Sequence, residues 1–400
     1  MSMGAGRARQ AGALFSRLPE DVQLAVLARV PYSDLHGRVA AACKAWRNMV
    51  ASNSFRKTRA AADCDEFGLL VSLYGTRWLH GVRPPMQCFL VTTTGARRAL
   101  PPPSGDENCW TVTLGQDVYF LGANRIGQYV GDHWTCDLDA FDLRRDAWRR
   151  LTPLVRADDE DDDSRGYLID PAPVVASESA GKIFVVGGDR SIHGIDSRRR
   201  VDMYDPASDT WSQLGDKPTI DTWENGVEVN GKLYFYGSNG DYDSNVDPDS
   251  IGIFDPETQA WSAGRFPHVL DERGDGPWNI TGFEWHGCLV VMARFRMGST
   301  YESIEYKAVL YDPSTDAWSE APFPAAPIQA YRCAHIDDTL FAWGSQGPEE
   351  RGDGTEPDSL WGAEGSRIVM LRPGSTTWVD VPMPPDLRCV GTSIAAVRLG

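Results

Sequence analysis

Short apolar runs, each ended by small or polar residues, recur along most of this chain. They are "DVYFLGA" (117–123), "GKIFVVGG" (181–188), "GKLYFYGS" (231–238), "GCLVVMAR" (287–294) and "DTLFAWGS" (338–345). Short runs rich in β-branched and aromatic residues and bounded by glycine are typical of buried strands. The pattern therefore predicts one buried β-strand in each of these five segments.

A tight-turn pattern follows each apolar run. "MYDPASDTWSQL" (203–214) returns as "IFDPETQAWSAG" (253–264) and "LYDPSTDAWSEA" (310–321), with weaker copies at 140–151 and 370–381. Asp-Pro suits the first two positions of a type I turn, because proline holds φ near about −65° and aspartate bonds back to the turn backbone. Each copy thus predicts a strand, a turn and an outer strand that opens with tryptophan.

The tryptophans of these copies are 50 to 63 residues apart, at Trp148, Trp211, Trp261, Trp318 and Trp378. Self-similarity near 50 residues indicates a propeller, in which each repeat is one four-stranded blade. A lone sheet of four strands cannot bury both faces, so the blades must stack around an axis. We expect the repeated tryptophans to pack between blades rather than to form a binding surface.

A sixth unit is divided between distant parts of the chain. Segments 67–75, 86–95 and 96–103 supply three strands without the tryptophan, and "CVGTSIAAVRL" (389–399) supplies the inner strand. Pairing the first and last segments closes the ring and removes free sheet edges. Residues 67–399 resemble a kelch-repeat propeller, although only Gly187-Gly188 keeps that family's glycine doublet. The expected fold is mainly β: a six-bladed kelch-type β-propeller closed by the C-terminal strand.

A short helical head precedes the propeller. "LFSRLPEDVQLAVLARVP" (14–31) predicts a helix that begins at Leu18-Pro19, with two acidic residues at its positive end. Its valines form one apolar stripe and its leucines another, whereas a surface helix normally needs one stripe. A second helical stretch spans 34–50, and Gly37 is expected to break it. So small a head leaves apolar surface uncovered, which predicts a partner.

The pattern "LP-E-D-V…L…VP…DL…V…C-x-x-W-R" resembles an F-box over residues 14–58. In that family the segment binds the Skp-type adaptor of an SCF ubiquitin ligase, and through it a cullin-RING ligase. The resemblance implies a set of adaptor-binding positions, some of which would contact the adaptor while others pack within the head. The sequence does not sort the two kinds among Leu18, Pro19, Val22, Leu27, Leu35, Val39, Cys43 and Trp46. The expected domains are a disordered N-terminus (1–13), the all-α F-box head (14–58), a linker (59–66) and the propeller (67–400).

An F-box immediately before a kelch propeller is a common plan for substrate receptors, particularly in plants. The resemblance therefore implies a non-catalytic receptor whose propeller binds the protein to be ubiquitinated. The alternative is a kelch-propeller enzyme or metal-dependent specifier-type protein with a helical N-terminal scaffold. The seven histidines form no H-x-H or H-E-x-x-H pair. Cys109, Cys333 and Cys389 fall near the starts of inner strands, and we interpret them as small buried residues rather than metal ligands. We expect no cofactor and no metal.

Charge divides the chain. Residues 1–63 hold 10 Lys/Arg against 4 Asp/Glu, and the remainder holds 29 against 52. An acidic body repels phosphate backbones, so we expect no nucleic-acid partner. The acidic run 158–163 favours a solvated loop over a docking site for a basic partner. No run is long enough to span a bilayer and the cysteines show no paired spacing, so we expect no membrane partner and a cytoplasmic or nuclear location.

Strand direction predicts where a substrate protein binds. Because strands alternate, the inner-to-second and third-to-outer turns share one face, and both kinds are short. The long connections lie on the opposite face, where binding is expected, and the head should sit on the short-turn side. Arginines, asparagines and tryptophans at the channel mouth and beyond form the predicted substrate-binding set: Asn108, Trp223, Asn279, Arg332, Arg388, Arg125, Arg190 and Arg296. Arg332 and Arg388 suit a carboxylate or phosphate, unless they pair with surrounding acids.

Overall fold

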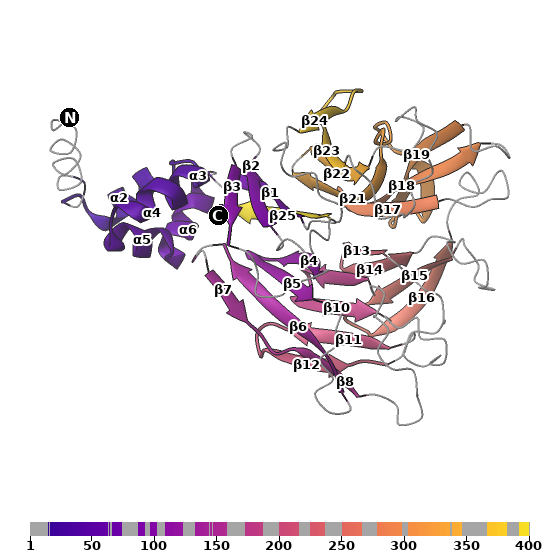
Figure 1. Cartoon of the computed structure of the whole chain (residues 1–400), viewed down its shortest axis with the longest axis horizontal. Coiled ribbons are helices and arrows are strands. Elements are labelled where there is room, and N and C mark those ends of the chain that lie inside the picture. Colours follow the sequence, from indigo (N-terminus) through magenta and orange to yellow (C-terminus); the bar gives the residue numbers. More distant parts are fainter. Residues whose placement is uncertain are drawn as a thin grey trace, which may run out of the picture.

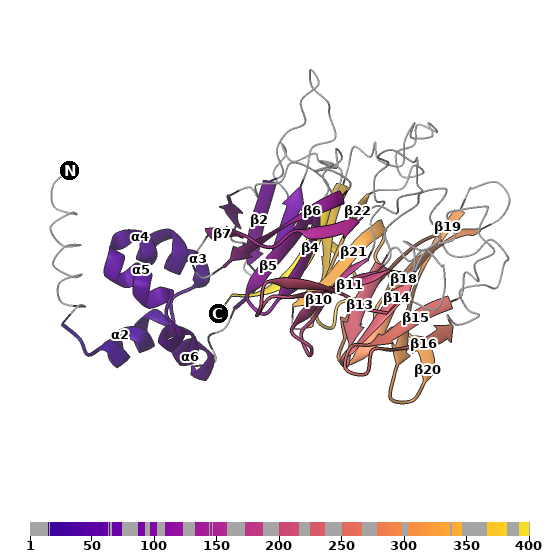
Figure 2. The ribbon, with the colours of Figure 1, turned by 90° about the horizontal axis from the view of Figure 1, so that it is seen from below.

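The computed structural model consists of six β-sheets around a central axis, with a group of helices beside them (Figures 1 and 2). This is the predicted arrangement of a six-bladed propeller and a small helical head. The structure describes residues 15, 17–62, 64, 66–73, 87–92, 97–101, 109–122, 133–143, 145, 147–157, 173–186, 200–215, 225–236, 250–265, 278–297, 303–336, 338–345, 366–381 and 392–399.

The blades follow one plan, in which consecutive strands run from the axis outward. Blade 2 contains β4 (Cys109–Leu114), β5 (Asp117–Gly122), β6 (His133–Asp142) and β7 (Ala147–Arg150). Blade 3 contains β9 (Val174–Ser177), β10 (Lys182–Val186), β11 (Val201–Asp205) and β12 (Thr210–Gln213). Blade 4 contains β13 (Asn225–Val229), β14 (Lys232–Tyr236), β15 (Ser250–Asp255) and β16 (Ala260–Arg265). Blade 5 contains β17 (Trp278–Trp285), β18 (Cys288–Met297), β19 (Ser303–Asp312) and β20 (Ala317–Glu320). Blade 6 contains β21 (Gln329–Ile336), β22 (Thr339–Ser345), β23 (Ser366–Leu371) and β24 (Val379–Val381).

Blade 1 is built from both ends of the propeller segment, as predicted. Its strands β1 (Glu66–Leu73), β2 (Gln87–Thr92) and β3 (Arg97–Leu100) follow the head, and β25 (Thr392–Leu399) is the inner strand. β25 pairs antiparallel with β1 in an unbroken register from Glu66↔Leu399 to Leu73↔Thr392. This pairing closes the ring.

An apolar cluster fills each junction between neighbouring blades. On β1, Leu70 belongs to the cluster shared with blade 2, whereas Leu69 and Val71 belong to the cluster shared with blade 6. Successive side chains of a strand point to opposite faces, so a continuous apolar run serves two junctions. This explains why the second strands read as unbroken apolar stretches.

The repeated Asp-Pro sequence forms a turn closed by its own aspartate. Asp205 Oδ1 accepts the backbone N–H of Ala207 at 2.9 Å, and Asp312 Oδ1 accepts that of Ser314 at 2.8 Å. The last turn residue has a left-handed backbone, with φ 54° at Asp209 and 53° at Asp316. Asp209 also accepts the hydroxyl of Tyr204 at 2.6 Å. The turn motif is therefore structural.

The tryptophan after each turn reaches toward the preceding blade. The indole Nε1–H of Trp148 donates to the carbonyl of Pro101 at 2.9 Å, and that of Trp378 donates to Pro324 at 3.1 Å. Trp261 packs in the cluster between blades 3 and 4. Packing between blades is thus confirmed for these tryptophans.

The head contains α2 (Glu20–Leu27), α3 (Tyr32–Asp34), a π-helical turn η1 (Leu35–Val39), α4 (Ala40–Ala42), α5 (Lys44–Val50) and α6 (Asn53–Ala61). The expected break at Gly37 is wrong, because that residue lies inside the π-helical turn. The break falls at Cys43, whose backbone is extended (φ −160°, ψ 161°). Its thiol accepts the N–H of Trp46 at 3.5 Å and caps α5.

One strand was not predicted. β8 (Leu154–Ala157) pairs with residues His133 to Cys136 of β6. β5 pairs only with residues 137–142 of that long strand, which leaves its first part available to β8. Among the described residues, no helix is long and apolar enough to cross a bilayer.

Candidate functional site

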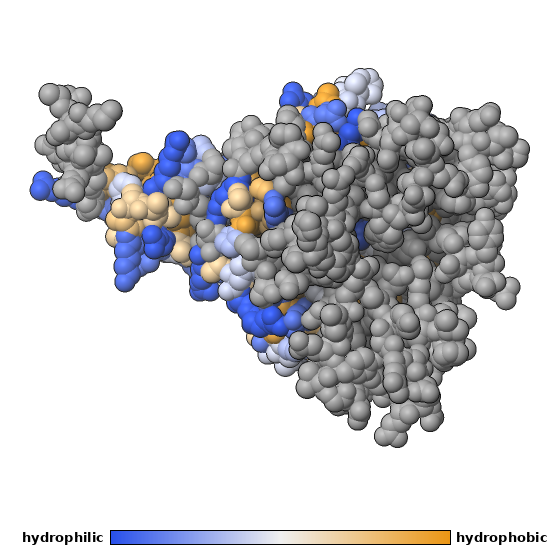
Figure 3. All heavy atoms as spheres, in the orientation of Figure 1, coloured by the Kyte–Doolittle hydropathy of each residue, from blue (hydrophilic) through white to orange (hydrophobic). Residues whose placement is uncertain are grey.

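The head presents a line of exposed aliphatic side chains. Leu18 is 40% exposed, Val22 39% and Val26 47%. Their spacing of four residues places them on one side of α2 and the segment before it. Figure 3 shows hydrophobic residues among strongly hydrophilic ones on the visible surface of the head. We call Leu18, Val22 and Val26 the exposed stripe.

Burial divides the predicted adaptor-binding set into two groups. Leu27 and Leu35 are buried in the core of the head with Leu24, Ala28, Val50 and Phe55, and Val39 packs partly buried against them. Leu18, Pro19 and Val22 are exposed. The buried group builds the head, whereas the side chains of Leu18, Pro19 and Val22 are accessible from outside it.

Cys43 and Trp46 have local roles. Cys43 is exposed and caps α5 through its thiol. The ring of Trp46 meets that of Phe15 edge-on, with centroids 5.0 Å apart. Val26 belongs to the surface group although the F-box pattern did not select it. Its place in the valine stripe of α2 was the signal in the sequence.

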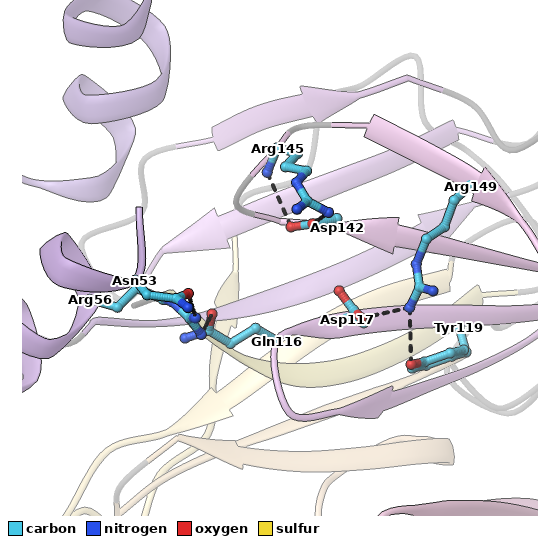
Figure 4. A network of polar contacts seen from close by, with 8 residues as sticks. All are labelled: Asn53, Arg56, Gln116, Asp117, Tyr119, Asp142, Arg145 and Arg149. Carbon is cyan, nitrogen blue, oxygen red and sulfur yellow. Dashed lines mark hydrogen bonds and ion pairs between the residues drawn. The ribbon is translucent and has the colours of Figure 1, made fainter. Parts of the chain in front are cut away.

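The head sits on the short-turn face of the propeller, as strand direction predicted. Arg56 of α6 donates to the side-chain oxygen of Gln116 at 3.0 Å, in the turn between β4 and β5 (Figure 4). The hydroxyl of Tyr32 donates to the carbonyl of Leu143 at 3.0 Å, after β6. Both contacts involve the short turns of blade 2. The head, and with it the exposed stripe, therefore lies away from the face of the propeller that carries the long connections.

A polar network beside this contact stabilises blade 2 (Figure 4). Arg149 Nη2 donates to Asp117 Oδ2 at 2.8 Å and lies 3.4 Å from the hydroxyl of Tyr119. Burial, with the nearby Asp117 carboxylate, raises the pKa of Tyr119 to about 12. That phenol is neutral at physiological pH, so the network is a packing element.

The predicted substrate-binding residues are only partly described. Asn108, Trp223, Arg388, Arg125 and Arg190 lie outside the described residues. Asn279 lies in β17, and Arg296 lies near the end of β18, where it pairs in register with Ile304. Arg332 lies in β21, the inner strand of blade 6.

Arg332 joins the inner strands of blades that are not neighbours. Its Nη1 donates to Asn225 Oδ1 on β13 of blade 4. The amide of Asn225 in turn donates to the carbonyl of Ile280 on β17 at 3.1 Å. These contacts connect blades 4, 5 and 6 at the axis. Asn225 was missed because nothing in its local sequence marks it.

Two uncharged side chains lie close to Arg332, the partly buried Cys333 and the buried Tyr236. Burial raises the pKa of the Cys333 thiol to about 12 and also raises the pKa of Tyr236. A protonated thiol is a weak metal ligand and a weak nucleophile. Cys333 instead lies 4.0 Å, sulfur to sulfur, from Met292. Within the described part of the chain, His, Cys, Asp and Glu form no group able to hold a metal ion. Cys109 begins β4, and Cys389 lies outside the described residues.

Comparisons with known proteins agree with both parts of the chain. The F-box domain model matches residues 15–58, and the kelch motif model matches residues 172–218. An Arabidopsis thaliana relative, F-box/kelch-repeat protein SKIP4, is 24% identical over 266 residues, or 64% of this chain and 67% of its own length. Another Arabidopsis F-box/kelch-repeat protein is 26% identical over 208 residues, covering 50% of this chain and 52% of that protein.

A mammalian relative matches more briefly. Kelch-like protein 35 of Mus musculus is 27% identical over 175 residues, which is 44% of this chain and 27% of that protein. The chain thus spans about a quarter of the mouse relative's length. The two family models, the similarity to Arabidopsis F-box/kelch-repeat proteins and the closed ring of six blades together support an F-box/kelch protein, with an F-box in the head and kelch-type blades in the propeller.

Proposed function

We propose that this protein is the substrate-recognition subunit of an SCF-type E3 ubiquitin ligase and is itself non-catalytic. The head binds a Skp-type adaptor, and the propeller binds the protein to be ubiquitinated. F-box and kelch relatives support a substrate-receptor role in general. The observation that carries the proposal is the exposed stripe, which lies outside both the head core and the head–propeller contact.

Three large aliphatic side chains in line are costly to leave in water. Covering apolar area contributes about 25 cal/mol per Å². The buried face of α2 already holds the head together through Leu24 and Leu27, so the stripe is not needed for folding. A partner with a complementary apolar surface accounts for it.

The test is capture of a purified Skp-type adaptor by the full chain. We expect Leu18→Ala with Pro19→Ala, and separately Val22→Asp with Val26→Asp, to reduce adaptor affinity by about tenfold or more while the thermal transition stays where it is. Val379→Ala is the matched control, because Val379 is 42% exposed but lies on the propeller strand β24. Wild-type affinity in both double variants would reject the adaptor assignment.

We further propose that the substrate binds at the axial end of the propeller that contains Arg332. Its guanidinium is held by an amide oxygen, and its planar fork suits a carboxylate or phosphate of the partner. Arg388 is included from its matching sequence position.

Proteins captured while the proteasome is blocked provide the test. Arg332→Ala with Arg388→Ala is expected to lose the captured substrate and keep the adaptor. Arg332→Lys keeps the charge but not the fork, so it should recover only part of the binding. Equal substrate recovery from the double variant and the wild type would reject this site.

A further inference from the structure

Tyr32 belongs to the head in sequence and to the propeller in packing. It begins α3, yet it is only 2% exposed and lies in the cluster between blades 1 and 2. That cluster includes Leu70 and Leu90 of blade 1 and Phe120 and Phe141 of blade 2. The ring thus fills a junction that the blades do not fill alone.

Polar contacts hold the Tyr32 ring in this position. Its hydroxyl donates to the carbonyl of Leu143 at 3.0 Å and lies 3.3 Å from Arg98 Nη1. The guanidinium of Arg98 also lies 5.9 Å from the ring centroid, within the range of a cation–π contact. The backbone N–H of Tyr32 donates to Glu66 Oε1 at 2.9 Å. Both ends of the residue therefore contact the propeller.

Arg59 makes the second connection. This arginine of α6 is 1% exposed, and its Nη1 donates to the carbonyls of Ala28 at 3.0 Å and Val30 at 2.8 Å. Its Nη2 forms an ion pair with Glu66 Oε1 at 2.7 Å, on the first residue of β1. One carboxylate oxygen thus joins α6, α3 and the propeller. Moving the head would leave a buried guanidinium without its counter-ion, which is strongly unfavourable.

We propose that Tyr32, Arg59 and Glu66 lock the head onto the junction of blades 1 and 2, so that head and propeller form one rigid, cooperatively folded unit. The contact between Arg56 and Gln116 adds a further point on blade 2 (Figure 4). The exposed stripe then has a fixed direction relative to the axial end that contains Arg332. If the proposed function holds, on which this consequence rests, the lock fixes the distance between adaptor and substrate.

The lock also changes how the head can be removed experimentally. A chain that starts at the propeller lacks Tyr32 and exposes the cluster around Leu70. Deleting the head should therefore damage the propeller, which is proposed to bind the substrate, as well as removing the surface that is proposed to bind the adaptor. Substitutions in the exposed stripe avoid this.

The experiment compares full-length Tyr32→Ala, Tyr32→Phe and Glu66→Gln with the wild type by calorimetry, small-angle X-ray scattering and limited proteolysis. The wild type should unfold in a single calorimetric transition. Its scattering curve should give a single, compact maximum dimension for the particle. Tyr32→Ala should separate head and propeller transitions, increase the maximum dimension and speed cleavage between residues 60 and 66 by about tenfold. Glu66→Gln should change each reading in the same direction, and Tyr32→Phe, which keeps the ring, should change each one least. Val379→Ala serves as the control and should change none.

Failure of the lock and failure of the proposed function give different results. If Tyr32→Ala does not fold, Glu66→Gln decides, because it removes only a charge and keeps the shape. Wild-type cleavage and a single transition in Glu66→Gln, and in Tyr32→Ala if it folds, would overturn the lock. Adaptor capture should be unchanged in all these variants, since the exposed stripe is intact. Absence of capture by the wild type would reject the adaptor assignment and leave the lock standing.

Discussion

Trp211 donates its indole Nε1–H to the backbone carbonyl of Thr152 at 2.9 Å, which ties the outer strand of blade 3 to the segment leaving blade 2. Asp209, in the turn just before this tryptophan, accepts the N–H of the same Thr152 at 2.9 Å. In blade 3 the motif therefore holds the neighbouring blade with both a donor and an acceptor. In this blade the turn and the tryptophan act together, because both contact the same residue of the preceding blade.

Removing the Trp211 side chain should destabilise the propeller. The ring packs against Tyr204 with centroids 5.1 Å apart, so Trp211→Ala should lower the free energy of unfolding by about 2–4 kcal/mol. Trp211→Phe keeps a ring and loses the donor, which should cost about 0.5–1.5 kcal/mol. Chemical denaturation of both variants measures the difference. Equal stability of Trp211→Ala and the wild type would contradict the inter-blade role.

Deleting residues 389–400 should open the ring. β1 would lose its whole partner β25 and expose an unpaired edge, so soluble yield should collapse. Size-exclusion chromatography of the truncated chain checks this. Deleting residues 1–12 is the control and should leave yield unchanged. A monomeric C-terminal truncation with a normal thermal transition would show that β25 is dispensable.

Gly282 of β17 has no room for a methyl group. A Cβ there would lie 2.6 Å from the hydroxyl oxygen of Tyr236 and 3.0 Å from the carbonyl oxygen of Val290. Gly282→Ala should therefore cost about 1–3 kcal/mol of stability. Gly264→Ala is the matched control, because its nearest neighbour would be 3.4 Å away. Comparable thermal transitions for the two variants would contradict the prediction.

The pair of Glu284 and His335 should make one part of the stability depend on pH. His335 Nε2 lies 3.0 Å from Glu284 Oε2, and this hydrogen bond lowers the pKa of Glu284 below its ordinary value of 4.5. A carboxyl group whose pKa is lower in the folded than in the unfolded state stabilises the fold at pH values above its unfolded-state pKa. This contribution is lost as the pH falls through its folded-state pKa. Glu284→Gln should therefore be less stable than the wild type at neutral pH. The melting temperatures of the wild type and Glu284→Gln should converge as the pH falls below 4.5, the ordinary pKa of a glutamate. A difference in melting temperature that stays constant down to acid unfolding would count against the role of this pair.

Local sequence determined most of the fold, because its turns and strands depend on residues close in the chain. Asp205-Pro206 specifies its turn through a bond to a residue two positions away. The continuous apolar run of β1, whose successive side chains point to opposite faces, explains both the strand and its two junctions. The closing strand β25 was predictable because the first unit lacked an inner strand and the final segment resembled one.

Tertiary structure decided which of these residues are exposed at the surface. The F-box pattern placed Leu18 and Leu27 in one set, and only packing separates the exposed residue from the buried one. Tyr32 joins a cluster with residues such as Phe141, more than one hundred positions away. Arg332 and Asn225 meet across the axis although 107 residues separate them. Such contacts arise only when the ring closes, because they depend on how blades are arranged in space and leave no mark on the local pattern.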